Sequence, residues 1–304
     1  MKKYIITICI IVALVIICIA GYFIYQSINS KVDEGTLKAK ANQEMQYLNT
    51  NIISIMNQFN HISYPNYKIV EAEIKTSEQT GGSESSSQGS KQGSSSSESS
   101  GGSQEKSQSE DNTNTTTEIS NIIANSILTN NNTAIDWNKI KQEVELLYAK
   151  WPSILVDLSS LNVNKDNLLK FTDTLNQTVS ALEKKDKKNS LNKLSDLYTL
   201  TNLYLKDFSN DQIMINLFST KAYIARAYAL TEDSKWEEMK KDIGSAKTEY
   251  AKILNNSLDS KNVNSINKGY ILLNEMEKNI DAKDKNVFFI NYKNLMQELD
   301  TIGK

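Results

Sequence analysis

Side chains that carry most enzyme and metal chemistry are scarce in this 304-residue chain. It contains one histidine, His61, one arginine, Arg226, and two cysteines, Cys9 and Cys18. Because both cysteines lie in the apolar N-terminal run, the rest of the chain has no thiol and no disulfide. A single histidine excludes most nucleophile–base pairs and the usual histidine–cysteine metal sites. We therefore expect no catalysis, no metal ion and no other cofactor.

A surplus of either charge is missing as well. The chain has 34 Lys+Arg and 36 Asp+Glu residues, which gives a net charge of −2. Nucleic-acid binding needs a clustered basic surface, so we expect no nucleic-acid partner. The sequence also lacks the short signatures of phosphate-binding loops, dinucleotide folds, serine hydrolases and zinc proteases.

Turn-forming residues are few in the C-terminal two-thirds of the chain. From residue 118 onward there is one proline, Pro152, and there are three glycines. A sheet protein needs more turns than these residues supply, so we expect an all-α fold. Pro152 predicts a kink or a restart of its helix near Trp151. Amphipathic stretches predict a bundle of about seven helices in 118–304, near residues 140–158, 164–183, 188–208, 211–230, 235–254, 265–280 and 285–301.

An uninterrupted apolar run opens the chain. Residues 4–25 carry no charge, and a helix of these 22 residues is about 33 Å long, which is enough to cross a bilayer. Lys2 and Lys3 precede the run, so we expect the tail 1–3 inside the cell and the bulk of the chain outside. The sequence thus predicts a single-pass protein of the cell membrane with an extracytoplasmic bundle.

Two other interpretations of the N-terminal run stay open. If the run is a cleaved signal peptide, the cleavage site follows Ala20, although the apolar run is longer than the apolar core of an ordinary signal peptide. A lipoprotein signal needs a small residue before the modified cysteine, whereas Ile17 precedes Cys18. The retained anchor is therefore favoured.

A heptad pattern follows within residues 26–75. Its apolar positions are spaced alternately by four and three residues: Ala41, Met45, Leu48, Ile52, Ile55, Phe59 and Ile62. This pattern is typical of a coiled-coil stalk, which would make the protein a homodimer. Charges are scarce at the flanking positions, so the alternative is a helix that packs into the bundle of its own chain. Pro65 is expected to end the helix.

Serine and glycine dominate residues 76–117. Between residues 77 and 110 they fill 21 of 34 positions, and no aromatic or aliphatic side chain occurs there. Nothing in this segment offsets the entropy of ordering it, so we expect a disordered linker. It is either a spacer that reaches into a cell wall or an insertion between two helices.

Two parts of the expected bundle resemble each other. When the chain is shifted by about 99 residues, 136–208 matches 235–302, and the order of three helices is preserved. We therefore expect a duplicated three-helix unit, whose copies are joined by a central helix at 211–230. The matches include Trp137 with Trp236, 162–164 with 262–264, and 185–187 with 283–285.

The central helix is apolar on most sides, which predicts that it is buried. Ser219, Tyr223 and Arg226 share one stripe of it, and no acid on the same helix lies within reach of Arg226. A buried guanidinium needs compensation, so this stripe is a candidate pocket for an anionic small ligand. The alternative is a structural ion pair between Arg226 and an acid of another helix, or exposure of Arg226 at the rim.

These observations predict a membrane-anchored, extracytoplasmic helical bundle without catalysis. Its expected role is protein interaction, scaffolding or envelope attachment, with a protein or a cell-envelope component as partner. The alternative is a sensor or binding domain for an anionic small ligand, built on Ser219, Tyr223 and Arg226.

Overall fold

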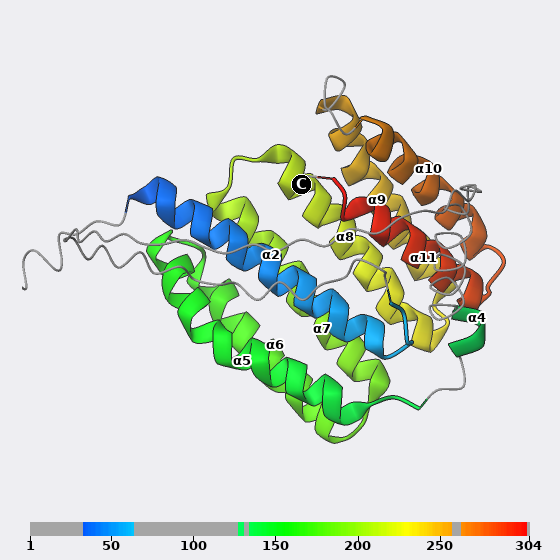
Figure 1. Ribbon diagram of the computed structural model, residues 1–304, viewed down its shortest axis with the longest axis horizontal. Helices are drawn as coiled ribbons and strands as arrows, with labels where there is room; N and C mark the ends of the chain where they lie inside the picture. Colours follow the sequence, from blue (N-terminus) through cyan, green and yellow to red (C-terminus); the bar gives the residue numbers. More distant parts are fainter. Residues whose placement is uncertain (1–32, 64–126, 131–133, 257–262, 303–304) are drawn as a thin grey trace, which may run out of the picture.

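The computed structural model describes residues 33–63, 127–130, 134–256 and 263–302 of the chain. Every regular element within these residues is a helix, which confirms the all-α prediction (Figure 1). In chain order the elements are α2 (Glu34–Gln58), α4 (Ile127–Asn130), α5 (Trp137–Ser160), α6 (Lys165–Glu183), α7 (Lys187–Phe208), α8 (Gln212–Leu230), the 3-10 turn η1 (Thr231–Asp233), α9 (Trp236–Asn256), α10 (Val263–Ile280) and α11 (Lys285–Leu299).

Some sequence predictions concern other parts of the chain. The apolar run 4–25 and the Ser/Gly-rich stretch 76–117 both lie outside the described residues. Among the helices that the structure describes, none combines the length and the apolar character that a membrane span requires.

Aspartate caps explain where most helices of the bundle begin. Asp136, Asp186, Asp211 and Asp284 each accept a hydrogen bond from a backbone N–H in the first turn of the following helix. Such a bond satisfies a donor that the start of a helix leaves without a partner. For α6 to α11, the predicted and observed bounds agree within two residues.

The predicted restart near Trp151 is wrong, because α5 continues through Pro152 without a break. Pro152 itself is exposed, whereas Trp151 and Ile154 on either side of it are buried. The Trp151 ring stacks on Phe171 of α6 with 4.0 Å between ring centroids. We attribute the continuity to this packing, which offsets the hydrogen bond that a proline inside a helix removes.

Helix α2 belongs to the bundle of its own chain. All seven apolar positions of its heptad pattern are buried, and α2 packs against α5 and α7. Of the two interpretations of the pattern, the structure therefore shows the intrachain one. The helix ends at Gln58, well before Pro65, and His61 adopts a positive φ of 51° in the turn that follows. Ile62 N–H closes this turn by donating to the Asn57 carbonyl at 3.0 Å.

The chain leaves α2 and enters α5 at the same end of the bundle. The rings of Phe59 and Trp137 meet edge to face with 5.6 Å between centroids, and Gln58 Nε2 donates to Glu143 Oε2. At the other end of the pair, Lys40 Nζ of α2 lies 2.7 Å from Asp157 Oδ2 of α5. The two helices are thus antiparallel neighbours.

The helices form two units of four. In the first unit, α2 contacts α5 and α7, and α6 contacts both of them as well. In the second unit, α8 contacts α9 and α11, and α10 contacts both of them. The extra contact of α8 with α7 joins the units, and α8 lies between them in Figure 1. The predicted central helix is therefore the first helix of the second unit and also the bridge to the first.

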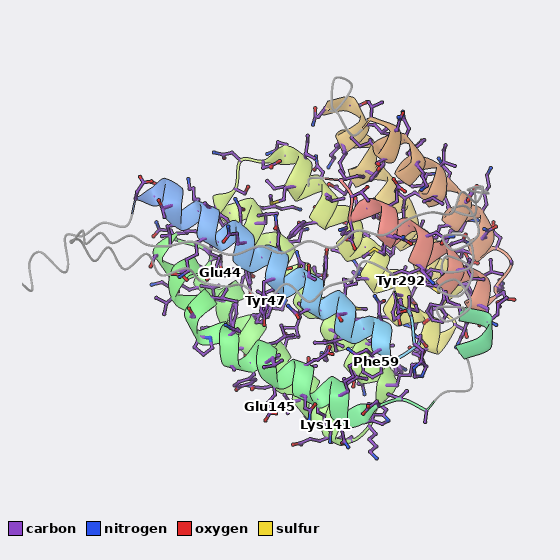
Figure 2. All side chains as sticks on the ribbon, in the orientation of Figure 1. Glu44, Tyr47, Phe59, Lys141, Glu145 and Tyr292 are labelled. Carbon is purple, nitrogen blue, oxygen red and sulfur yellow. The ribbon has the colours of Figure 1, made fainter. Side chains whose placement is uncertain are left out.

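The last turn of α2 also links the units. The Tyr228 hydroxyl of α8 donates to the Met56 carbonyl at 2.9 Å and accepts from Asn60 Nδ2 at 2.7 Å. The Tyr292 hydroxyl of α11 donates to Asn57 Oδ1 at 2.9 Å, and Figure 2 shows Tyr292 near the end of α2 that carries Phe59. Because these groups are buried, each hydrogen bond is costly to break without replacement.

Buried positions coincide between the last three helices of each unit. With a shift of 99 residues for α5 and α9 and of 98 for the other helices, ten pairs in the first two helices are buried in both units, and seven more pairs match between α7 and α11. The ten pairs are Ile140 and Met239, Val144 and Ile243, Leu147 and Ala246, Trp151 and Tyr250, Ile154 and Ile253, Leu168 and Ile266, Phe171 and Gly269, Leu175 and Leu273, Thr178 and Met276, and Leu182 and Ile280.

Candidate interaction surface

The structure separates the three residues of the predicted ligand stripe. Ser219 is buried against α7, where its hydroxyl exchanges hydrogen bonds of 3.1 and 3.2 Å with the Asn202 amide. Arg226 instead points toward α9, and its guanidinium lies 5.7 Å from the centre of the Tyr223 ring. Tyr223 and Arg226 are therefore together, and Ser219 is not with them.

Arg226 has the ion pair that the sequence offered as the alternative to a pocket. Its Nη2 lies 3.3 Å from Asp242 Oδ1 of α9. The Arg226 side chain is 48% exposed, whereas that of Asp242 is 7% exposed. Burial raises the pKa of the Asp242 carboxyl above its ordinary value, and the Arg226 charge opposes this rise. The expectation that Arg226 is buried is wrong, because its long side chain reaches solvent at the α8–α9 edge.

Exposed apolar side chains gather on one pair of helices. Among the described residues, seven large hydrophobic side chains are exposed, and four of them belong to α5 and α6. These four are Leu146 (60% exposed), Tyr148 (44%), Val156 (64%) and Leu169 (63%).

The register of α5 and α6 places several of these residues side by side. Tyr148 Oη donates to Asn176 Oδ1 at 2.9 Å, and Trp151 Nε1 donates to Thr172 Oγ1 at 2.8 Å. In an antiparallel pair of helices with these contacts, Val156 lies level with Leu169. Pro152 is exposed one turn before Val156. We define Leu146, Tyr148, Pro152, Val156 and Leu169 as the outer apolar face, in which Leu146 lies on the flank of α5 toward α2 and Tyr148 on the flank toward α6.

The outer apolar face has no counterpart in the second unit. The equivalent residues, with the shifts given above, are Ser245, Lys247, Ala251, Asn255 and Asn267. Four of the five are polar, although α9 and α10 pack with the same buried positions as α5 and α6. Lys247 there forms an ion pair with Glu277. Packing of the helix pair therefore does not require apolar side chains on its outer side.

The outer apolar face is not among the sites predicted from the sequence. Its signal was present in the sequence: Leu146, Tyr148 and Val156 are large apolar residues that lie off the buried period of Ile140, Val144, Leu147, Trp151, Ile154 and Leu158. Apolar residues outside the buried stripe of an amphipathic helix indicate an exposed patch.

Other kinds of site find little support in the described ranges. They hold no group of three or more histidine, cysteine, aspartate or glutamate side chains arranged to bind a metal ion. Comparisons of the chain with protein-family models, with curated proteins and with solved structures gave no significant match.

Proposed function

We propose that this protein is a non-catalytic interaction module that binds another protein through the outer apolar face of α5 and α6. The observation that carries the proposal is the contrast between the two units. Large apolar side chains are exposed on the first unit at positions where the second unit carries Ser245, Lys247, Asn255 and Asn267. Large apolar side chains that are exposed close together on a bundle, as Tyr148, Pro152, Val156 and Leu169 are, favour a binding site.

We propose further that residues 4–25 anchor the bundle in the cell membrane, with the bundle outside the cell. The apolar run ends eight residues before α2 begins at residue 34. Since α2 is integral to the bundle, the anchor joins the bundle directly at the N-terminal end of α2. Such a module fits scaffolding or envelope attachment. Recovery of the full-length protein in the membrane pellet after an alkaline carbonate wash supports the anchor, and recovery in the supernatant contradicts it.

We also infer that the two units arose by duplication. The coincident buried positions support this inference, as does the turn before the last helix of each unit. Lys185 and Lys283 have φ values of 51° and 52°, and each precedes an aspartate that caps the next helix. A homodimer remains a proposal that needs another surface, because the apolar seam of α2 is buried within its own chain.

The anionic-ligand alternative rests on the position of Arg226. Its guanidinium is half exposed above the Tyr223 ring, and one acid pairs with it. Titration of the protein and of Arg226→Ala with anionic metabolites tests this alternative. Binding that Arg226→Ala abolishes while the fold is intact would favour it over protein interaction.

The interaction is tested by photo-crosslinking of the full-length protein in its own cells. A photoreactive amino acid at Val156 is expected to give a discrete crosslinked product, and Leu169→Asp is expected to remove that product by placing a charge in the same patch. The matched control carries the photoreactive residue at Asn255 of the second unit. Equal products from both positions, or none from position 156, would contradict the proposal.

A further inference from the structure

A buried acidic pair joins α2 to α5 outside the surface described above. Glu44 of α2 is 7% exposed, and the side chain of Asp157 of α5 is 15% exposed. Lys40, one turn before Glu44, lies 2.7 Å from Asp157 Oδ2 and 3.9 Å from Glu44 Oε1. Figure 2 shows Glu44 in the N-terminal half of α2, on the part of the helix that runs alongside α5.

Each carboxyl group of the pair has one buried oxygen atom without a hydrogen-bond donor among the described residues. The two carboxyl groups lie within hydrogen-bonding reach of each other. Glu44 Oε2 and Asp157 Oδ2 are both buried, and no described residue donates a well-aligned hydrogen bond to either of them. Lys40 Nζ forms an ion pair with Asp157 Oδ2, whereas it approaches Glu44 only at Oε1. Ionised carboxylates are acceptors only, so two of them repel in such a contact. A proton on one of them turns the same contact into an O–H···O⁻ hydrogen bond.

The charges around Glu44 are those of Asp157 and Lys40. Helix α7 packs on α2 as well, and the contact of Thr201 with Asn49 sets its register. The charged residues of α7 near the level of Glu44 are Lys206 and Asp207, and both are exposed. Burial and the Asp157 carboxyl raise the pKa of Glu44 to about 8, while the Lys40 charge opposes this rise. One ammonium group thus faces two carboxyl groups in a site with little water.

We propose that Glu44 is protonated at neutral pH and donates a hydrogen bond to Asp157, and that this bond clamps α2 to α5 and is released as the medium becomes alkaline. The clamp holds the helix that follows the apolar run 4–25. Proton loss would therefore loosen the bundle at the end where that run joins it. The device is independent of the outer apolar face and of any bound partner.

The direction of the pH effect follows from the two states of Glu44. In the unfolded chain its pKa has the ordinary value of 4.5, and in the folded chain it is raised to about 8. Between these values the folded state holds a proton that the unfolded state has lost. The stabilisation is therefore complete below the lower value, declines as pH rises, and is lost above the higher one.

Amide hydrogen exchange of α2 tests the clamp on the full-length protein in detergent. From about pH 7 to about pH 9, exchange corrected for its intrinsic pH dependence is expected to increase about tenfold. Glu44→Gln keeps the shape of the side chain and donates an N–H to Asp157 at every pH, so its corrected exchange is expected to stay constant. An equal increase in the wild type and in Glu44→Gln would overturn the proposal.

Two further variants keep the test decisive. Glu298→Gln changes a buried glutamate of α11 that pairs with Lys268 and is expected to preserve the wild-type pH response. Asp157→Asn removes the second carboxyl group and is expected to move the midpoint of the response to lower pH. A midpoint that does not move in Asp157→Asn would show that Asp157 does not hold the proton on Glu44, and would overturn the proposal.

Discussion

The two units of this protein bury the same positions and fill them differently. In the first unit, Trp151 stacks on Phe171 across α5 and α6. In the second unit, Tyr250 stands at the position of Trp151, and Gly269 stands at that of Phe171. The Tyr250 hydroxyl occupies the space beside Gly269 and donates to the Ile266 carbonyl at 2.8 Å. Two large rings are thus replaced by one ring and a glycine, so the periodicity is kept while the shapes change.

The outer surfaces differ more than the cores. Burial constrains a core position to apolar side chains of compatible volume, whereas the outer side of a helix pair has no such constraint. The second unit shows that this helix pair folds with polar outer residues. The apolar residues of the first unit therefore carry a cost in solubility that packing does not explain, and we propose that they bind a partner.

The largest effect is expected at Gly269, where the cores differ most. A Cβ at this position would overlap the Tyr250 hydroxyl and approach its Cζ to 2.9 Å. Because Tyr250 is fully buried and hydrogen-bonded, it has little room to move. Gly269→Ala is expected to lower the free energy of unfolding by about 2 kcal/mol, as measured by chemical denaturation of the full-length protein.

Two companion variants identify the cause of that loss. Gly244→Ala also lies in a helix, but its Cβ would meet only Glu277 Oε1, at 3.9 Å. It is expected to stabilise the protein slightly, since alanine favours helix over glycine. Tyr250→Phe removes the overlapping hydroxyl and is expected to recover part of the stability in the Gly269→Ala background. Equal losses from both glycine variants would contradict the packing described for Tyr250.

A smaller, pH-dependent effect is expected at the α8–α9 edge. Burial raises the pKa of Asp242 and Arg226 opposes the rise, so Arg226→Ala would raise it further. The contribution of such a carboxyl to stability is complete below its unfolded pKa and is lost as pH rises through the folded value. Arg226→Ala is therefore expected to destabilise the protein by about 1 kcal/mol at neutral pH and by less in acid. A loss that is equal at both pH values would contradict the pairing with Asp242.

The sequence predicted the helices well, because their signals are local. The amphipathic period and the aspartate caps lie within each helix, and so the bounds of α7, predicted at 188–208, agree with Lys187–Phe208. The repeat of Lys-Asp-Lys at 185–187 and 283–285 also predicted two equivalent turns.

Predictions that depended on contacts between different helices were less successful. The stripe of Ser219, Tyr223 and Arg226 is divided because α8 faces α7 on one side and α9 on another, and periodicity does not identify these partners. The contact between Glu44 and Asp157 joins residues on either side of the long stretch between α2 and α5, so no local pattern indicated it. Pro152 predicted a restart because the packing that holds α5 together lies on α6.

The proposal that the outer apolar face binds a partner is tested most directly by replacing its residues with those of the second unit. Four substitutions, Leu146→Ser, Tyr148→Lys, Val156→Asn and Leu169→Asn, give the first unit the outer residues of the second. With the photoreactive residue at the exposed Pro152, this variant is expected to lose the crosslinked partner, while its free energy of unfolding changes by less than about 1 kcal/mol. A variant that keeps the crosslink, or that unfolds, would show that these side chains serve the fold rather than a partner.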